Sequence, residues 1–301
     1  MAEQGKTVMR IGPYEVRAVQ AGWFRLDGGA MFGVVPKVLW ERRTPADERN
    51  RILLGTRCLL LIGAGRVVLV DVGIGAKYSE KFADLYGIDQ REHDLESGLR
   101  AHGLRPEDVT DVLLTHLHFD HVGGATRWAE PGRAVPTFPR ATYYVQRSQW
   151  EAALKPNARE RASFLGENFL PLLEAHQLEF LDGNVEVLPG IHTRVVNGHT
   201  RGQQLVKVSD GQHTLLYAAD LLPTVHHIGL PWIMAYDMCA QTTLTEKALL
   251  LEQAAQEGWW LFFEHDPEIT LCRVRRTERD FEPVDEHREL PADWPTASLP
   301  A

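Results

Sequence analysis

Four side chains of types that bind metals fall within six positions, directly after an apolar segment that reads as a buried strand. Residues 109–115 form that segment, and the side chains that follow it are His116, His118, Asp120 and His121. In an extended chain, residues i and i+2 point to the same side, so His116 and His118 can converge on one ion. The paired glycines after the motif permit a turn that would direct Asp120 and His121 toward a second ion.

The donor types in this motif predict which ions it binds. Neutral imidazole and carboxylate groups favour zinc, manganese, iron or cobalt over calcium and magnesium. A catalytic zinc site uses three protein ligands and leaves a position open for water, so a cluster of four predicts two ions. We expect two divalent transition-metal ions, with zinc first. The alternative is a solvated polar loop that contains histidines by chance.

Further ligands are expected downstream, each at the end of a predicted strand. His199 follows the strand at residues 191–196, Asp220 ends an apolar strand, and His265 ends another. A single histidine or aspartate at a strand end is more typical of an ordinary surface residue. The order of these three residues after the motif favours their assignment as ligands, with the aspartate placed to bridge two ions.

Composition limits the partners of the chain. It has 301 residues, and its formal net charge of −9 argues against a nucleic-acid partner or an anionic membrane surface. Its three cysteines are widely spaced, which suits a reducing compartment. No apolar run has the length of a membrane span, and the N-terminus lacks the apolar core of a signal peptide. We expect a cytoplasmic protein with a small neutral substrate.

Strand-rich blocks, each closed by a helix, cover both halves of the chain. This pattern predicts two sheets with helices outside them. Within it we expect a hairpin turning at residues 63–65, a strand pair turning at 210–211 and a helix over 243–256. We expect one domain over residues 1–301, with an irregular loop at 28–51 and a charged, loosely held tail at 277–301 both peripheral.

The chain resembles the metallo-β-lactamase superfamily of dinuclear hydrolases. The resemblance runs from DVG at Asp71 through THLHFDH, GHT at His199 and AAD at Asp220 to EHD at His265. It implies an α/β fold, the αββα four-layer sandwich, with the site at one edge of two sheets. It also implies that His116, His118 and His199 hold a first metal and that Asp120, His121 and His265 hold a second. Asp220 would bridge the two metals, and Asp71 would orient a ligand from behind.

Two segments are similar to one branch of that superfamily. LDGGAMFGVVPKVLWERR at residues 26–43 resembles the YtnP-type N-acyl-homoserine lactonases, which are quorum-quenching enzymes. YVQRSQWE, starting at Tyr144, resembles a segment of lactonases and of methyl parathion hydrolase. Lactonases place a tyrosine three positions after the bridging aspartate, whereas this chain has Pro223. The residues that could replace that tyrosine are Tyr217, His226, His227 and Tyr236.

The implied reaction is hydrolysis of a lactone ring, with an N-acyl-homoserine as product. The leaving alkoxide needs a proton, and Asp120 is the expected donor, the alternative being a role as ligand only. An acyl chain needs an apolar groove. The expected substrate contacts are Met31, Phe32, Trp40, His226, His227 and Trp232, with Ile228, Leu230, Ile233 and Met234 as further lining. The alternative for these apolar segments is ordinary packing or the contact surface of a homodimer.

Three other functions fit the same residues. A phosphotriester or phosphodiester hydrolase would use the same pair of metals, and an iron-dependent sulfur dioxygenase would use one iron and a thiol substrate. A binding protein that retains the fold without catalysis would be expected to have lost ligands, and this chain has all seven. A metal-dependent lactonase is therefore the prediction.

Overall fold

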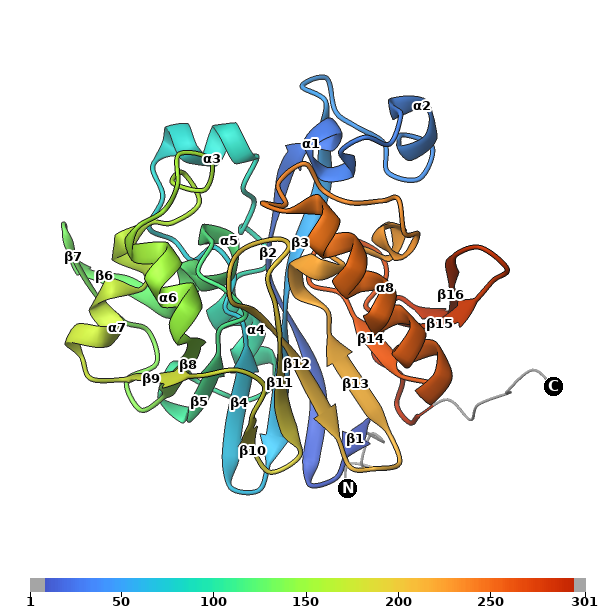
Figure 1. Ribbon diagram of the computed structural model, residues 1–301. Coiled ribbons are helices and arrows are strands. Elements are labelled where there is room, and N and C mark those ends of the chain that lie inside the picture. Colours follow the sequence, from blue (N-terminus) through green and yellow to red (C-terminus); the bar gives the residue numbers. More distant parts are fainter. Residues whose placement is uncertain (1–8, 295–301) are drawn as a thin grey trace.

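Two seven-stranded sheets pack face to face, and helices cover their outer faces (Figure 1). The computed structural model describes residues 9–294. The first sheet has the strands, in spatial order, β1 (Arg10–Ile11), β2 (Tyr14–Asp27), β3 (Arg51–Gly63), β4 (Arg66–Val70), β5 (Asp111–Leu113), β8 (Thr142–Gln146) and β9 (Leu178–Leu181). The second has β10 (Glu186–Leu188), β11 (Ile191–Val196), β12 (Gln203–Ser209), β13 (Thr214–Tyr217), β14 (Trp260–Phe262), β15 (Leu271–Arg276) and β16 (Phe281–His287). A separate hairpin consists of β6 (Thr126–Glu130) and β7 (Arg133–Pro136).

The helices follow from the strand directions. β4, β5, β8 and β9 are parallel neighbours, so the chain must cross over between them, and helices lie in these crossovers. The crossover from β13 to its parallel neighbour β14 contains the longest helix of the described residues. The helices are α1 (Gly28–Phe32), α2 (Lys37–Trp40), α3 (Glu80–Tyr86), α4 (Leu95–Ala101), α5 (Phe119–Val122), α6 (Arg147–Leu154), α7 (Leu170–Glu174) and α8 (Ala240–Glu257). The 3-10 turns are η1 (Pro106–Asp108), η2 (Gly123–Ala125), η3 (Gly166–Asn168), η4 (Ala219–Leu221) and η5 (Val225–Ile228).

Alternation along the central strands divides the core into two layers. In β4, Val68 and Val70 pack toward the second sheet and α8, whereas Leu69 packs toward α4 and the helices on the other face. The central strands β4 and β5 therefore bury both faces, as the parallel part of a sheet between helices and a second sheet requires. The predicted αββα sandwich is confirmed.

Two expectations about the chain's periphery need correction. Residues 28–51 are not an irregular loop throughout, because α1 and α2 form within them and Asp27 caps α1 by accepting the N–H of Ala30. The predicted loose tail at 277–301 is wrong for residues 281–287, because β16 pairs antiparallel with β15 and buries Phe281. Residues 295–301 lie outside the described residues.

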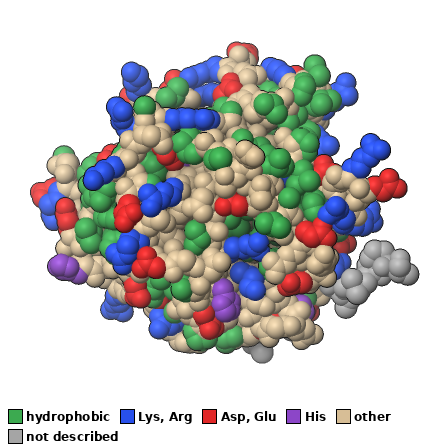
Figure 2. All heavy atoms as spheres, viewed as in Figure 1, with side chains coloured by type: hydrophobic (Ala, Val, Ile, Leu, Met, Phe, Trp, Pro, Cys, Tyr) green, Lys and Arg blue, Asp and Glu red, His purple; other side chains and the backbone are tan. Residues whose placement is uncertain are grey.

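The surface carries charges of both signs. On the face shown in Figure 2, lysine and arginine side chains are interspersed with aspartate and glutamate, and small hydrophobic groups lie between them. Among residues 9–294, each helix is too short or too polar to cross a lipid bilayer.

Candidate active site

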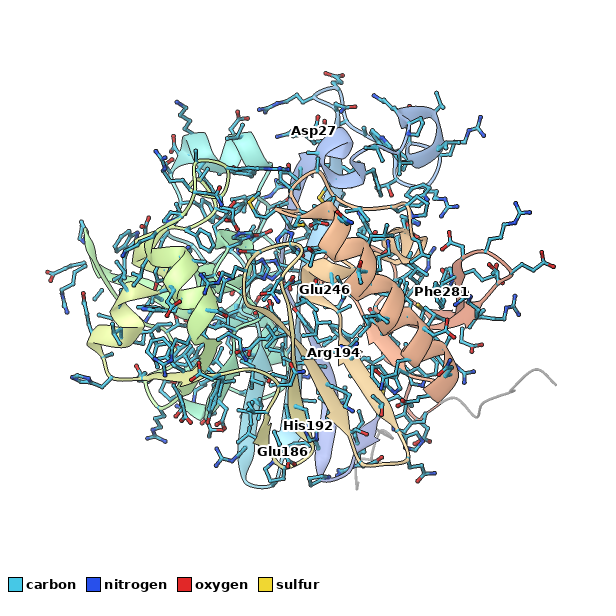
Figure 3. The ribbon with its side chains drawn as sticks, in the orientation of Figure 1. Asp27, Glu186, His192, Arg194, Glu246 and Phe281 are labelled. Atoms are coloured by element: carbon cyan, nitrogen blue, oxygen red, sulfur yellow. The ribbon has the colours of Figure 1, made fainter. Side chains whose placement is uncertain are left out.

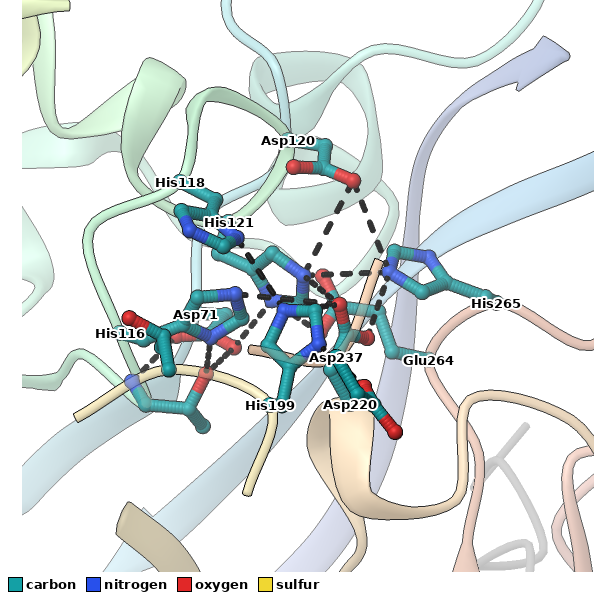
Figure 4. Close-up of polar contacts among 12 residues, drawn as sticks. Asp71, His116, His118, Asp120, His121, His199, Asp220, Asp237, Glu264 and His265 are labelled. Atoms are coloured by element: carbon teal, nitrogen blue, oxygen red, sulfur yellow. Dashed lines mark hydrogen bonds and ion pairs between the residues drawn. The ribbon is translucent and has the colours of Figure 1, made fainter. Parts of the chain in front are cut away.

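The candidate site lies at the edge where parallel strands of both sheets end. β4 and β5 are parallel, as are β13 and β14, so their carboxyl ends meet at this edge. Four segments that follow these and neighbouring strands bring together all seven ligands predicted from the sequence (Figure 4). They are between 0% and 8% exposed: His116, His118, Asp120, His121, His199, Asp220 and His265.

A close backbone contact sets the turn after the HxHxDH motif. α5 begins directly after His118, and its first turn carries Asp120 and His121. A Cβ atom on Gly123 would lie 1.9 Å from the carbonyl oxygen of Ile74, so only glycine fits where α5 meets that loop. The glycine therefore lets the motif turn pack directly against the loop that follows β4.

Helix α8 holds the turn that carries His199 (Figure 3). The carboxylate of Glu246 accepts the backbone N–H groups of Asn197 at 2.8 Å and Gly198 at 3.0 Å. A Cβ atom on Gly198 would lie 2.3 Å from Thr243 Oγ1, so this glycine allows the turn to approach α8. These contacts fix the position of His199 from outside the sheet.

The first group of predicted ligands contains three histidines and one aspartate. His118 Nδ1 lies 3.2 Å from His199 Nε2. Asp220 Oδ2 lies 3.2 Å from His199 Nε2 and 3.8 Å from His116 Nε2. These four atoms are the ones that face one another across a small central space.

The second group lies on the other side of Asp220. His121 Nε2 lies 3.1 Å from His265 Nε2, and Asp120 Oδ2 lies 3.9 Å from the first of these atoms and 3.8 Å from the second. Asp220 Oδ1 lies 3.2 Å from His265 Nε2, and Asp220 Oδ2 lies 3.5 Å from His121 Nε2. Asp220 therefore contacts both groups, as a bridging ligand would.

Buried acceptors behind the histidines fix their tautomers. His265 Nδ1 lies 2.8 Å from the carbonyl oxygen of Gly55, which can only accept, so this nitrogen carries the proton. His199 Nδ1 donates to Asp237 at 2.9 Å. His121 Nδ1 lies 2.9 Å from both Asp71 Oδ2 and Glu264 Oε2. With these protons on Nδ1, the Nε2 atoms direct lone pairs toward the centre of the site.

This arrangement leaves electron pairs facing one another with nothing between them. His121 Nε2 and His265 Nε2 lie 3.1 Å apart although both rings carry their protons on Nδ1, and His118 Nδ1 lies 3.2 Å from His199 Nε2. His116 Nε2 and Asp220 Oδ1 are also buried without a hydrogen-bond partner among the described residues. Buried polar atoms are rarely left unpaired, so cations in the two central spaces would satisfy all of them. The donor set of imidazole and carboxylate fits divalent transition metals.

The electrostatics of the buried groups also favours cations in the two central spaces. Burial lowers the pKa of His116 and His118 well below the ordinary value, and neighbouring imidazoles add to this effect, so both rings stay neutral and able to bind a metal. Burial alone would raise the pKa of Asp220, but three histidines outweigh it and hold that pKa well below the usual range. Burial likewise opposes protonation of His265, yet Asp220 raises its pKa to about 9, so without a bound ion a proton would occupy Nε2 in its place. The carboxylates therefore attract positive charge to the places where the ions would sit.

Comparison with known proteins identifies the family. The model of the metallo-β-lactamase superfamily matches residues 51–265, which contain all seven predicted ligands. The chain belongs to the metallo-β-lactamase superfamily. It is thus a hydrolase of this superfamily, and its histidine and aspartate clusters fit divalent metal ions.

Curated relatives of this hydrolase include lactonases. It is 31% identical over 180 residues to the N-acyl homoserine lactonase of Bacillus thuringiensis, across 58% of this chain and 64% of that protein. It is 30% identical over 138 residues to the N-acyl homoserine lactonase AttM of Rhizobium radiobacter, across 43% of this chain and 47% of the relative. The matched part therefore spans less than two thirds of the length of these relatives.

Solved structures resemble nearly the whole hydrolase. A probable metal-dependent hydrolase from Staphylococcus aureus superposes with a TM-score of 0.83 at 30% identity and covers 92% of this chain and 99% of its own. The dizinc quorum-quenching lactonase AidC superposes with a TM-score of 0.76, covering 94% of this chain and 99% of its own. Because the identity to AidC is 19%, that likeness shows the fold alone.

The sequence did not identify every residue of the hydrolase that supports its candidate ligands. Asp237 lies in the irregular segment between η5 and α8, and no sequence pattern marks it. Glu264 is adjacent to His265, and that adjacency was the available signal. Burial raises the pKa of Glu264 to about 7, and its Oε2 accepts the hydroxyl of Tyr217 at 2.6 Å. Tyr217 is fully buried in this contact, so it does not face a substrate.

A cavity opens above the predicted ligands of the hydrolase, and the short helix α1 and two irregular segments form its rim. We call residues 28–32, 155–164 and 229–239 the rim. The backbone N–H of Ala235 donates to Ala30 at 2.8 Å, and Arg159 donates to the carbonyl oxygen of Ala235, so the three segments are joined. Besides the predicted ligands, the cavity wall contains Leu26, Met31, Tyr86, Phe119, Arg159, Glu160, Ser163, Met234, Tyr236 and Met238.

The structure corrects the predicted substrate contacts. Of the six, Met31 lies on the cavity wall, as does Met234 from the wider predicted lining. The other five do not line this cavity: Phe32, Trp40, His226, His227 and Trp232. Phe32 stacks on Trp40 and on His227 at centroid distances of 5.4 and 5.0 Å. His227 Nε2 lies 2.8 Å from the carbonyl oxygen of Met31, which it holds in place.

The residues that could replace the missing lactonase tyrosine also differ in whether they lie on the cavity wall. Tyr236 lies on the cavity wall, and so does Tyr86, which the sequence did not suggest. Neither hydroxyl has a hydrogen-bond partner within residues 9–294, so both are free to bind a ligand. Pro223 is structural, because its carbonyl oxygen accepts the backbone N–H of His265 at 3.2 Å.

Proposed function

We propose that this hydrolase holds two divalent transition-metal ions, with zinc first, and opens the lactone ring of N-acyl-homoserine lactones. The observation that carries the metal centre is the pair of short imidazole contacts on either side of Asp220, in one of which, His121 to His265, two nitrogen lone pairs face each other. The proposed first-metal ligands are His116, His118 and His199, and the proposed second-metal ligands are Asp120, His121 and His265, with Asp220 shared. Ions bound there would supply Lewis acidity and lower the pKa of water toward neutrality.

The lactone substrate is supported by the relatives and by the cavity. The relatives at about 30% identity are named N-acyl homoserine lactonases. The cavity wall combines apolar side chains such as Met31 and Phe119 with the free hydroxyls of Tyr86 and Tyr236. An amide-bearing ring with an alkyl tail matches such a wall, in which a few polar groups orient a mostly apolar ligand.

The chain's own groups account for the proton that the opened ring requires. Asp120 lies on the cavity wall and reaches the second group of ligands through Oδ2. We assign Asp120 the transfer of a proton from the attacking water to the leaving alkoxide oxygen, in addition to its role as a ligand. His121 and His265, held from behind by buried acceptors, lie 3.9 and 3.8 Å from Asp120 Oδ2.

A substrate panel tests the proposed substrate. Protein loaded with zinc is mixed with a long-chain N-acyl-homoserine lactone, a simple aryl ester and a neutral phosphotriester, and ring opening is measured by proton release. We expect the lactone to have the highest kcat/KM of the three. Rapid cleavage of the phosphotriester with an intact lactone would contradict the lactonase assignment and favour the phosphotriester hydrolase.

The Asp120→Asn variant tests the proton donor. We expect kcat for the lactone to fall by roughly 100-fold or more, because the alkoxide then leaves unprotonated. An aryl ester, whose phenolate leaves readily without a proton, is the matched control and should lose much less. Metal content is measured alongside. Equal losses on both substrates with full metal content would remove Asp120 from the donor role.

A further inference from the structure

Each of the five histidines in the site has one ring nitrogen that points away from the centre. These far nitrogens do not all have a hydrogen-bond partner. In four rings the nitrogen that points away from the centre has a partner within 3.0 Å: His116, His121, His199 and His265. His118 is the exception. Its Nδ1 faces His199 across the first group, and its Nε2 is buried without a hydrogen-bond partner among the described residues.

A carboxylate that no sequence motif predicted lies beside that nitrogen. Glu160 Oε1 lies 4.0 Å from His118 Nε2 and is 8% exposed as a residue. Thr200, next to His199, donates its hydroxyl to Glu160 Oε1 at 2.6 Å, and Asn157 donates to Oε2 at 2.5 Å. No lysine or arginine of residues 9–294 pairs with this carboxylate. Each of its oxygens has a lone pair left for another donor.

Binding a metal through Nδ1 makes the far nitrogen of His118 a donor. The ring then carries its proton on Nε2, and a buried N–H without an acceptor is costly. A change of about 1 Å in the Nε2 to Oε1 distance would bring these atoms to normal hydrogen-bond length. We infer that Glu160 is the positioning residue of His118, accepting its Nε2–H and so holding the ring toward the first metal. This inference rests on the metal centre of the proposed function and not on the identity of the substrate.

The placement of Glu160 distinguishes it from the other supporting groups. Asp71 and Gly55 belong to the strands and strand ends of the first sheet, whereas Glu160 belongs to the rim. Its backbone N–H, like that of Arg159, donates to Asn157 Oδ1, which shapes this turn. The guanidinium of Arg159 then bonds to Ala235 across the cavity mouth. The affinity of the first metal position is thereby linked to the fold of the rim.

Metal binding measured by competition with a chromophoric zinc chelator tests this role. The variants are Glu160→Leu, Glu160→Gln and, as a comparator that removes the acceptor of His199, Asp237→Leu. We expect Glu160→Leu to weaken one of the two zinc ions by about 10- to 100-fold, as loss of such an acceptor does elsewhere. Glu160→Gln keeps an acceptor oxygen and should lose less. Glu167→Gln, which removes an exposed carboxylate of the neighbouring segment, is the charge-matched control and should bind as wild type.

Long-range proton–nitrogen NMR spectra of the imidazole rings provide the second measurement. In the zinc-loaded wild type, the His118 Nε2–H signal should be protected from solvent exchange, and Glu160→Leu should lose that protection. Wild-type zinc affinity in Glu160→Leu would overturn the inference, as would weaker binding with an unchanged Nε2–H signal. If Glu160→Leu does not fold, Glu160→Ala, which also removes the acceptor, replaces it, and an unchanged affinity with an unchanged signal in that variant overturns the inference. A wild-type protein that binds no zinc overturns the proposed function as well, whereas the other outcomes leave that function standing.

Discussion

The base of the cavity and its rim are built in different ways. In the base, each predicted ligand follows a strand end, and a second buried group fixes most of the histidine rings from behind. In the rim, residues 28–32, 155–164 and 229–239 contain little regular structure and hold one another through single contacts. One such contact joins Ala235 to Ala30, and another joins Arg159 to Ala235.

Because of this difference, we expect the base to determine the chemistry and the rim to determine substrate selectivity. A base set by sheet topology can change little without loss of the fold, because each strand end is fixed by its neighbours. A rim made of irregular segments can change its side chains with small cost to the core, which is why binding specificity is commonly found on loops over a rigid scaffold. Variants in the base should therefore alter metal binding and all substrates together, whereas variants in the rim, apart from those that replace Glu160, should alter substrate preference.

The largest expected effect comes from the residue that contacts both ligand groups. Asp220→Ala should lower kcat/KM by roughly a thousandfold or more, because it removes the shared carboxylate and weakens the binding of both ions. Metal content by mass spectrometry and lactone turnover check this result. Asp182→Ala, which removes a 70% exposed aspartate side chain, is the control and should retain both. If Asp220→Ala kept both ions, the base would not depend on this residue as we propose.

The same division explains what the sequence could predict. The fold and the convergence of the seven side chains were predictable, because the motif is local and strand ends meet at one edge of a sheet. The regular pattern of apolar residues along the sequence also predicted β3, β4 and α8. The rim was not predictable, because its conformation depends on contacts between residues such as Ala30 and Ala235, far apart in the chain. Phe32 and Trp40 look like pocket aromatics in the sequence, but they pack against each other beneath the rim.

A buried lysine allows the rim to be perturbed separately from the base. Lys247 of α8 is fully buried, and its ammonium donates to the carbonyl oxygens of Gly229 at 2.6 Å and Trp232 at 2.8 Å. Lys247→Met removes these donors and should destabilise the protein by about 1–3 kcal/mol in urea unfolding. Zinc content of the folded variant should match wild type. Loss of zinc at equal folding would show that rim and base are not separable here.

The pH dependence of that loss has a definite sign. Burial lowers the pKa of Lys247 to about 7, below its value of about 10.4 in an unfolded chain. Between these values the unfolded chain binds a proton that the folded protein has released, so wild-type stability gains with rising pH at this group. The Lys247→Met variant has no titrating group at this position, so it lacks this gain in stability. The stability gap between wild type and Lys247→Met should therefore widen from pH 7 to pH 9, by at most about 1.4 kcal/mol per pH unit. A constant gap would contradict the lowered pKa.

The smallest expected effect lies on the cavity wall. Tyr236 is 38% exposed, and burial of its phenol raises the pKa, so the hydroxyl remains a donor at all working pH values. Tyr236→Phe should lower kcat/KM for an N-acyl-homoserine lactone by about 2- to 10-fold, the value of one neutral hydrogen bond, with zinc content unchanged. Tyr78→Phe, which removes a hydroxyl bonded to Gln90 away from this cavity, is the matched control. Wild-type kinetics in Tyr236→Phe would show that another group donates a hydrogen bond to the substrate. The Tyr86→Phe variant would then test the other free hydroxyl of the cavity wall. A Tyr236→Phe enzyme that lost zinc instead would break the division between rim and base, because a rim hydroxyl would then be supporting the metal centre.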